Sequence, residues 1–134
     1  MVAINNGSMR ANLYETIYDT LTSANLLSST VTVTAAYIDD DDDKFPQVVI
    51  HPVDVSKSPL SFDRTHYSND MSVMIDVWTK KNKEKDQISD EIDALLSPLK
   101  ISGACLVDWS ESNALEPVGG NKIHLKTIVI SYRR

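Results

Sequence analysis

The most conspicuous chemical groups in this sequence are five consecutive carboxylates: Asp39, Asp40, Asp41, Asp42 and Asp43. Carboxylates are good ligands for Ca²⁺. A calcium loop, however, requires glycine at its sixth position and glutamate at its twelfth, where this sequence has Lys44 and Ile50. Neighbouring charges about 6 Å apart repel each other by roughly 0.7 kcal/mol even in water, which favours a solvated loop. The run therefore predicts no metal site, and contact with a basic partner remains the alternative to a purely solvated loop.

The other candidate groups form no known catalytic pattern. The three histidines, His51, His66 and His124, are scattered and include no pair at the spacing of helical metal ligands. No Gly-x-Ser-x-Gly elbow occurs, and the Gly-Gly-Asn-Lys segment at 119–122 fits a hairpin turn better than a phosphate-binding loop. Asp76 and Asp108 match the carboxylates of a metal nuclease in type only, because no Glu-x-Lys follows them. We expect no enzymatic activity, catalytic residue, metal or cofactor, and keep a small Asp-dependent metal hydrolase as an alternative.

Length and composition indicate a single globular domain. Of the 134 residues, 42% are hydrophobic and 24% are charged, which are ordinary values for a folded soluble protein. The formal charge of −6 gives the chain no general affinity for phosphates, so we expect no nucleic-acid recognition. Four lysines, Lys80, Lys81, Lys83 and Lys85, form a local basic cluster, for which we expect a solvated helix entrance.

The single cysteine and the chain's ends complete this outline. Cys105 excludes an internal disulfide and lies in an apolar run, which predicts a buried, unreactive thiol. No apolar stretch approaches 18 residues and no leader pattern is visible, so we expect synthesis in the cytoplasm and no membrane contact. Residues 1–9 predict a flexible N-terminal segment, in which Gly7-Ser8-Met9 could be a remnant of cloning. Residues 10–134 predict one domain.

Hydrophobic periodicity predicts two helices and five strands. The first helix begins near residues 10–12 and extends to Leu27, with its apolar residues on one stripe. The second helix follows a charged corner at 80–86, shows its apolar stripe from Ile88 onward and stops at Pro98. Alternating apolar residues predict strands over 31–37, 47–53, 71–79, about 104–111 and about 122–133. Pro117 and the glycines after it separate the last two strands and predict a long-looped hairpin.

The segment 54–69 is long, polar and weakly patterned. Such a segment in a compact domain is either a functional loop or an extended hairpin arm. It contains side chains that are suited to binding, namely Lys57, Phe62, Arg64 and His66. Together with the acidic run 39–43, these residues make up the interaction surface that we predict from the sequence.

The predicted fold class is α+β, with the element order α-β-β-β-α-β-β. Helices with one apolar stripe and strands with one apolar face pack as two layers, so we expect a mostly antiparallel sheet with both helices on one face. The last strand has apolar residues on both faces, because Ile128, Ile130 and Tyr132 alternate with a series that includes Val129. A second apolar face favours oligomerisation.

One unit of the chain resembles a known family. The strand Val-Met-Ile-Asp-Val-Trp-Thr at 73–79, the charged corner and Ile-Ser-Asp-Glu-Ile-Asp-Ala-Leu-Leu at 88–96 resemble the central strand–helix unit of siphophage tail completion proteins. This family includes tail terminators and tail-to-head joining proteins. The opening helix, Phe-Pro-Gln-Val-Val-Ile at 45–50 and Ile-Ser-Tyr-Arg-Arg at 130–134 agree in order and spacing. The resemblance covers most of residues 10–134 and depends on apolar patterns, not on a chemical motif.

This resemblance implies a structural protein of the virion, located in the tail at the head–tail interface and lacking catalytic residues. It implies a ring, usually a hexamer, that caps the tail tube and joins the tail to the capsid connector. The implied partners are therefore the tail tube protein, the head-completion or connector protein and further copies of the chain, which can be monomeric before assembly. A soluble adaptor or oligomeric interaction module outside phages is the alternative that the residues leave open.

Overall fold

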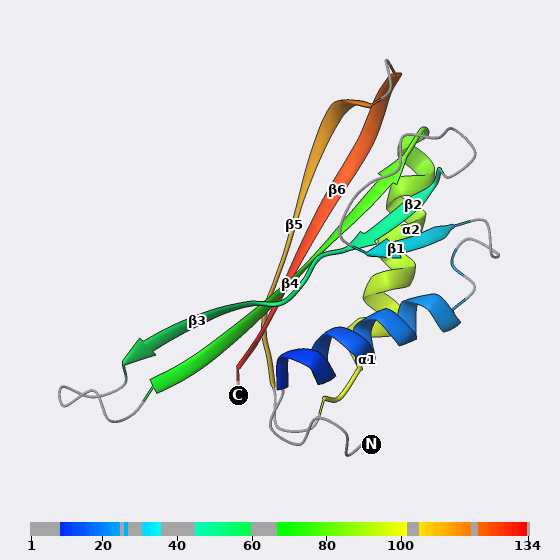
Figure 1. Cartoon of the computed structure of the whole chain (residues 1–134). Coiled ribbons are helices and arrows are strands. Elements are labelled where there is room, and N and C mark those ends of the chain that lie inside the picture. The colour runs from blue at the N-terminus through cyan, green and yellow to red at the C-terminus, as the bar shows by residue number, and fades with distance from the viewer. Residues whose placement is uncertain are drawn as a thin grey trace.

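The computed structural model describes residues 9–24, 26, 31–35, 45–59, 67–101, 105–118 and 121–133. Two helices and six strands lie within these ranges (Figure 1). Their bounds in chain order are α1 Met9–Ser23, β1 Thr32–Ala35, β2 Gln47–Ile50, β3 Asp54–Pro59, β4 Tyr67–Thr79, α2 Asn82–Leu96, β5 Cys105–Val118 and β6 Asn121–Arg133. The predicted α+β class is confirmed, and the sheet is mostly antiparallel.

The sheet is organised around β4, its central strand. The strand order is β1-β2-β4-β6-β5, and β3 also pairs with β4. β2 and β3 follow each other along one side of β4, because β2 lies opposite residues 75–78 and β3 lies opposite residues 67–72. β6 occupies the other side of β4 over residues 70–79. β3 and the first part of β4 therefore form an arm that extends away from the helices (Figure 1), and only its outer stretch, residues 57–59 with 67–69, lies beyond β6 as two strands.

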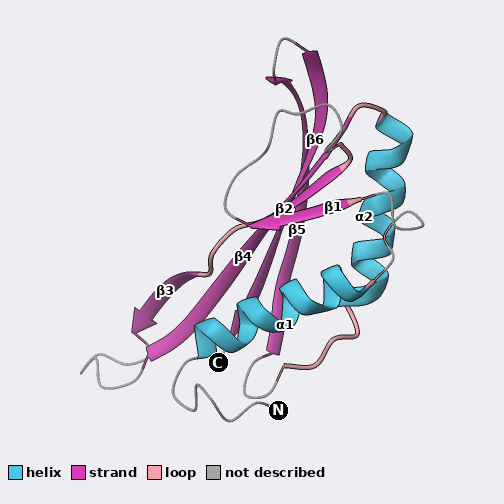
Figure 2. Cartoon of the chain, turned by 45° about the vertical axis from the view of Figure 1, so that its right-hand side comes forward, coloured by secondary structure: helices cyan, strands magenta, loops and turns pink. Residues whose placement is uncertain are grey.

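The hydrophobic core lies between the sheet and the two helices (Figure 2). Alternate residues of a strand point to the same face, and in β4 these are Met71, Val73, Ile75 and Val77, all of them buried. The same core contains Leu13, Ile17 and Leu21 of α1, Ile88, Ile92 and Leu96 of α2, and Ile128, Ile130 and Tyr132 of β6. The apolar stripes that periodicity predicts are thus the surfaces that fold against each other.

The helix ends differ from the predicted ones. α1 ends at Ser23, so the predicted end at Leu27 is wrong. In its last turns the hydroxyl of Thr22 donates to the carbonyl of Tyr18 at 2.8 Å, as the hydroxyl of Thr20 does to the carbonyl of Thr16 at 2.6 Å. α2 already begins at Asn82, so the charged corner forms its first turn, where Glu84 interacts favourably with the helix dipole. Lys85 consequently faces the protein and is buried, unlike the solvated residue that we predict from the sequence.

Two corrections concern the β5–β6 hairpin. Pairing continues to Val118↔Asn121, so β5 runs well past the predicted end at residue 111 and the hairpin does not have a long loop. Cys105 is exposed, which contradicts the predicted buried thiol. Both errors have one cause: β5 is an edge strand, so its length depends on backbone pairing with β6 rather than on burial of its side chains.

Candidate interaction surface

Most of the interaction surface predicted from the sequence lies outside the described residues. This applies to Asp39, Asp40, Asp41, Asp42, Asp43, Phe62, Arg64 and His66. Lys57 is described as a position in β3, opposite Asn69 of β4. The hairpin-arm interpretation of segment 54–69 is confirmed for its described part, which ends at the pair Pro59↔Tyr67. Phe62, Arg64 and His66 stand between these two residues in the sequence, and their role in binding stays a prediction.

The sheet face opposite the helices has a polar network centred on Asp76. Nε2 of His51 lies 2.8 Å from Oδ2 of Asp76, and the hydroxyl of Thr127 donates to Oδ1 at 2.8 Å. Asp76 is only 9% exposed, and partners on β6 and just after β2 satisfy both of its oxygens. Further along this face, the hydroxyls of Ser72 and Ser131 lie 3.0 Å apart. This network links the three neighbouring segments of the sheet.

Asp76 and Asp108, which a metal hydrolase would need to bring together at one ion, lie far apart on this face. Asp76 is paired with Thr127 of β6, whereas Asp108 of β5 is paired with Ser131. The four-residue offset corresponds to about 13 Å along the strands, too far for both carboxylates to bind one ion. Asp76 and Asp108 therefore do not form one metal site, which argues against the hydrolase alternative.

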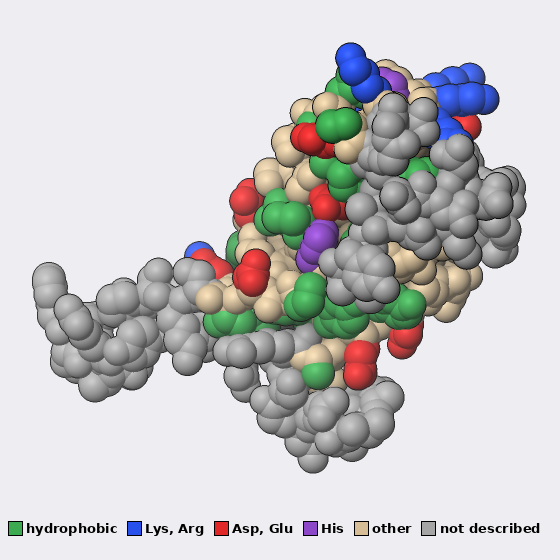
Figure 3. Space-filling view, turned by 45° about the horizontal axis from the view of Figure 1, so that its top comes forward, with side chains coloured by type: hydrophobic (Ala, Val, Ile, Leu, Met, Phe, Trp, Pro, Cys, Tyr) green, Lys and Arg blue, Asp and Glu red, His purple; other side chains and the backbone are tan. Residues whose placement is uncertain are grey.

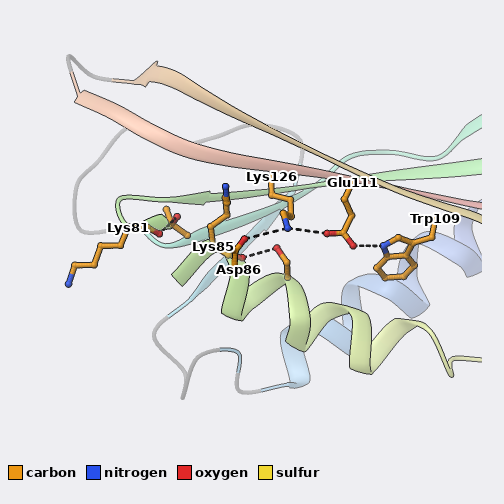
Figure 4. A network of polar contacts seen from close by, with 8 residues as sticks. Lys81, Lys85, Asp86, Trp109, Glu111 and Lys126 are labelled. Carbon is orange, nitrogen blue, oxygen red and sulfur yellow. Dashed lines mark hydrogen bonds and ion pairs between the residues drawn. The ribbon is translucent and has the colours of Figure 1, made fainter. Parts of the chain in front are cut away.

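A second polar network joins the β5–β6 hairpin to α2 (Figure 4). Nζ of Lys126 lies 3.2 Å from Oε1 of Glu111 on β5 and 3.5 Å from Oδ1 of Asp86 on α2. The indole N–H of Trp109 donates to the other oxygen of Glu111 at 2.8 Å. Burial lowers the pKa of Lys126, but its hydrogen bonds and ion pairs with Glu111 and Asp86 outweigh burial, so the pKa lies above the ordinary 10.5. The sequence does not show this network, since strand register brings its members together.

Charged side chains also mark both ends of β4. Beyond its C-terminal end, Lys80, Lys81 and Lys83 are exposed, and basic side chains gather at one end of the molecule in Figure 3. Near its N-terminal end, Nε of Arg133 donates to Oδ1 of Asp70 at 2.8 Å, and Nη2 donates to Oδ2 at 3.2 Å. The hydrogen bonds from Arg133 hold the pKa of Asp70 below its usual value. The surface is therefore locally basic at one end, although the whole chain is acidic.

A shallow hollow of about 370 Å³ lies between α1 and the segment that leads into β3. Its lining includes Ala11, Tyr14, Glu15, Pro52 and Val53. The hydroxyl of Tyr14 donates to the carbonyl of Ile50 at 3.3 Å, and its ring stacks on Tyr18 with centroids 6.1 Å apart. Burial, and to a smaller extent the neighbouring Tyr18, raise the pKa of Tyr14. This hydrogen bond ties α1 to the end of β2.

Within the described ranges, no group of three or more His, Cys, Asp or Glu side chains is arranged to hold a metal ion. The helices in these same ranges include none that is both long and apolar enough to span a bilayer.

No family model and no curated protein sequence matches the chain. Solved structures do match it. A chain in the virion of a native gene transfer agent particle is 17% identical with a TM-score of 0.61, and the match covers 98% of both chains. The bacteriophage SPP1 gp17 protein is 18% identical with a TM-score of 0.57, covering 96% of this chain and 95% of that one. The chain thus has the fold of these two proteins over nearly its whole length, and this shared fold supports its resemblance to siphophage tail completion proteins.

Proposed function

We propose that this chain is a structural protein of a phage virion, where it caps the tail tube and joins the tail to the capsid connector. The observation that carries the proposal is the shared fold with a virion chain of a gene transfer agent and with SPP1 gp17, which extends over nearly the full length of all three chains. The family resemblance that we infer from the order and spacing of apolar segments points the same way. The function needs no catalytic residue.

In this proposal the protein acts through surface complementarity. The proposed cap is a closed ring of copies, a hexamer, and a ring of identical copies requires head-to-tail contacts. The arm of β3 and β4 extends from the body of the domain, and the acidic run 39–43 adds a negatively charged segment. We assign the arm, with Lys57, Phe62, Arg64 and His66, and the acidic run to docking on the tail tube protein or the connector.

The alternative is a soluble adaptor of a cellular complex. It is supported by the same features, because an α+β domain with an arm and a free sheet edge can bind many partners. The two functions differ in what the ring recognises. Only the virion function predicts that the purified protein binds to the ends of assembled tail tubes, whereas an adaptor would show no preference for them.

The decisive experiment removes this chain from the phage that encodes it and images the resulting particles by electron microscopy. We expect DNA-filled heads and separate tails, and we expect joined virions to return when the chain is supplied in trans. Purified protein added to the separated heads and tails should also restore infectious particles. Normally joined virions in the absence of the chain would overturn the proposal.

A further inference from the structure

The exposed charges of α2 are arranged against the dipole of this helix. The N-terminal end of a helix has a partial positive charge, yet here it has Lys81 as the N-cap residue, without a side-chain cap, and the exposed Lys83. The C-terminal end has a partial negative charge, yet Asp93 stands in the last turn, which contains no basic residue. Asp86, Asp90 and Asp93 also follow each other at helical spacing, where like charges repel. Charges that lower the stability of their own helix indicate a role outside it.

The lysines belong to a patch that three segments form at one end of the sheet, which we call the basic end (Figure 3). Its exposed members are Lys80 and Lys81 after β4, Lys83 of α2 and Lys122 of β6. Lys122 reaches this end because His124, two residues further on, pairs with Thr79 at the end of β4. The acids beside it in the described part of the chain are the half-buried Glu84 and Glu116 of β5, so the patch keeps a surplus of positive charge.

Lys85 adds a cation that lacks a counter-ion. It lies in the first turn of α2 and is only 5% exposed, and its ammonium group has no hydrogen bond or ion pair with any described residue (Figure 4). Lys126, by contrast, pairs with Glu111 and Asp86. A charge so far removed from water is unfavourable without a partner. The basic end therefore favours an acidic partner from outside this copy.

The outer surface of the two helices has the opposite charge, and we call it the acidic helix face. Its exposed acids are Glu15 and Asp19 of α1 and Asp86, Asp90 and Asp93 of α2. Among the described side chains of this face, Lys83 is the one exposed base. Asp90 and Asp93 lie seven and ten residues after Lys83, about 10 and 15 Å along the helix axis. Lys83 therefore cannot neutralise them within one copy.

We propose that the basic end of one copy docks on the acidic helix face of a second copy, at Asp90 and Asp93. The occupant is a second copy because this chain carries both complementary surfaces, and a ring requires two different surfaces on each copy. A twofold contact between two α2 helices is disfavoured, since it would place the three acids of one stripe against the same three acids of the other. The inference deepens the proposed function by naming the surfaces that build the ring, and it rests on that function only for ring closure.

Charge reversal tests this contact with variants that are expected to fold. Lys81→Glu with Lys83→Glu makes the basic end acidic, and Asp90→Lys with Asp93→Lys makes the acidic helix face basic. Both changes place charges in the order that the helix dipole favours, so the thermal unfolding midpoints should equal or exceed that of the wild type. Asp54→Lys with Asp108→Lys, at exposed positions outside both surfaces, is the control with the same change in charge as the second variant.

Each full-length protein is treated with a carbodiimide, which joins amines to carboxylates that are in direct contact. The reaction is run at high protein concentration and low salt, and a mixture of isotope-labelled and unlabelled copies identifies the links between copies by mass spectrometry. We expect links from Lys81 or Lys83 of one copy to Asp90 or Asp93 of another. Either reversal, or added salt, should lower their yield several-fold, whereas the control should keep the wild-type yield.

Mixing the two reversed variants is the sharpest part of the test. In the mixture each copy meets the opposite charge at both of its surfaces, so links between copies should return, although neither variant forms them alone. An absence of links in the wild type, or no recovery in the mixture, would overturn the inference. It would also be overturned if reversal at Asp90 and Asp93 left the yield unchanged, since another acid would then occupy the basic end. The proposed function is tested separately, because joined virions without the chain would refute it even if the copies link as expected.

Discussion

Replacing Lys126 by Met should lower the free energy of unfolding by about 1 kcal/mol, because it cuts the link between the β5–β6 hairpin and α2 (Figure 4). The Lys126 side chain is only 13% exposed, and Met keeps most of its apolar stem. The pair with Asp86, whose side chain is 57% exposed, should contribute almost nothing. The loss therefore comes mainly from the bond to Glu111. It stays small because the Trp109 indole continues to satisfy that carboxylate.

The alanine variant separates packing from charge. Lys126→Ala removes the buried stem as well as the ammonium group, which adds about 2 kcal/mol at roughly 0.8 kcal/mol per buried methylene. We therefore expect a total loss of about 3 kcal/mol for alanine against about 1 kcal/mol for methionine. Equal losses in the two variants would mean that the stem does not pack against the hairpin as described.

Urea unfolding followed by circular dichroism measures these losses, and a double-mutant cycle with Glu111→Gln isolates the pair. Gln can still accept the hydrogen bond from Trp109, so the cycle removes only the charge interaction. We expect a coupling of about 0.5–1 kcal/mol that shrinks at high salt, since the pair is partly solvated. A coupling below about 0.3 kcal/mol, together with a methionine variant as stable as the wild type, would refute the reasoning.

Three further predictions concern pH and burial. Because the folded-state pKa of Lys126 is raised, its stabilising effect should be constant below pH 10.5 and disappear as the pH rises through the folded pKa, measured as the wild-type minus Lys126→Met difference. The Tyr132 hydroxyl is buried without a hydrogen-bond partner among the described residues, so Tyr132→Phe should raise the unfolding free energy by about 1 kcal/mol in urea titrations; a loss would indicate a hidden partner. Ile92→Ala should cost about 3 kcal/mol by thermal unfolding, while Leu115→Ala, at an exposed edge position, should change stability by less than about 0.5 kcal/mol.

The part of the fold that buries side chains could be predicted from the sequence. Leu13, Ile17 and Leu21 recur at helical spacing, and each is fully buried against the sheet. Met71, Val73, Ile75 and Val77 of β4 are buried in the same way at strand spacing. These elements can be predicted because burial of one face makes hydrophobic residues recur at the spacing of a helix or a strand.

The parts that depend on backbone pairing could not be predicted in the same way. The second half of β5, from Ser112 to Val118, is exposed wherever its side chains are described, so no alternation marks it as a strand. β3 is equally polar, and its pairing with β4 follows from the arm geometry. The Asp76 and Lys126 networks join residues that are up to 51 positions apart, and only the register of β6 against β4 and β5 brings them together.

The continuity of β4 has a mechanical consequence for the proposed function. One continuous strand belongs both to the arm, where it pairs with β3, and to the body of the domain, where it pairs with β6 from Asp70↔Arg133 to Thr79↔His124. A pull on the arm along the strand direction loads these antiparallel hydrogen bonds in shear, so they must break together rather than unzip one by one. A pulling force between a packaged head and its tail would then pass along β4 through the centre of the sheet. The resistance of the domain to such a pull would be set by its unfolding rate rather than by its equilibrium stability.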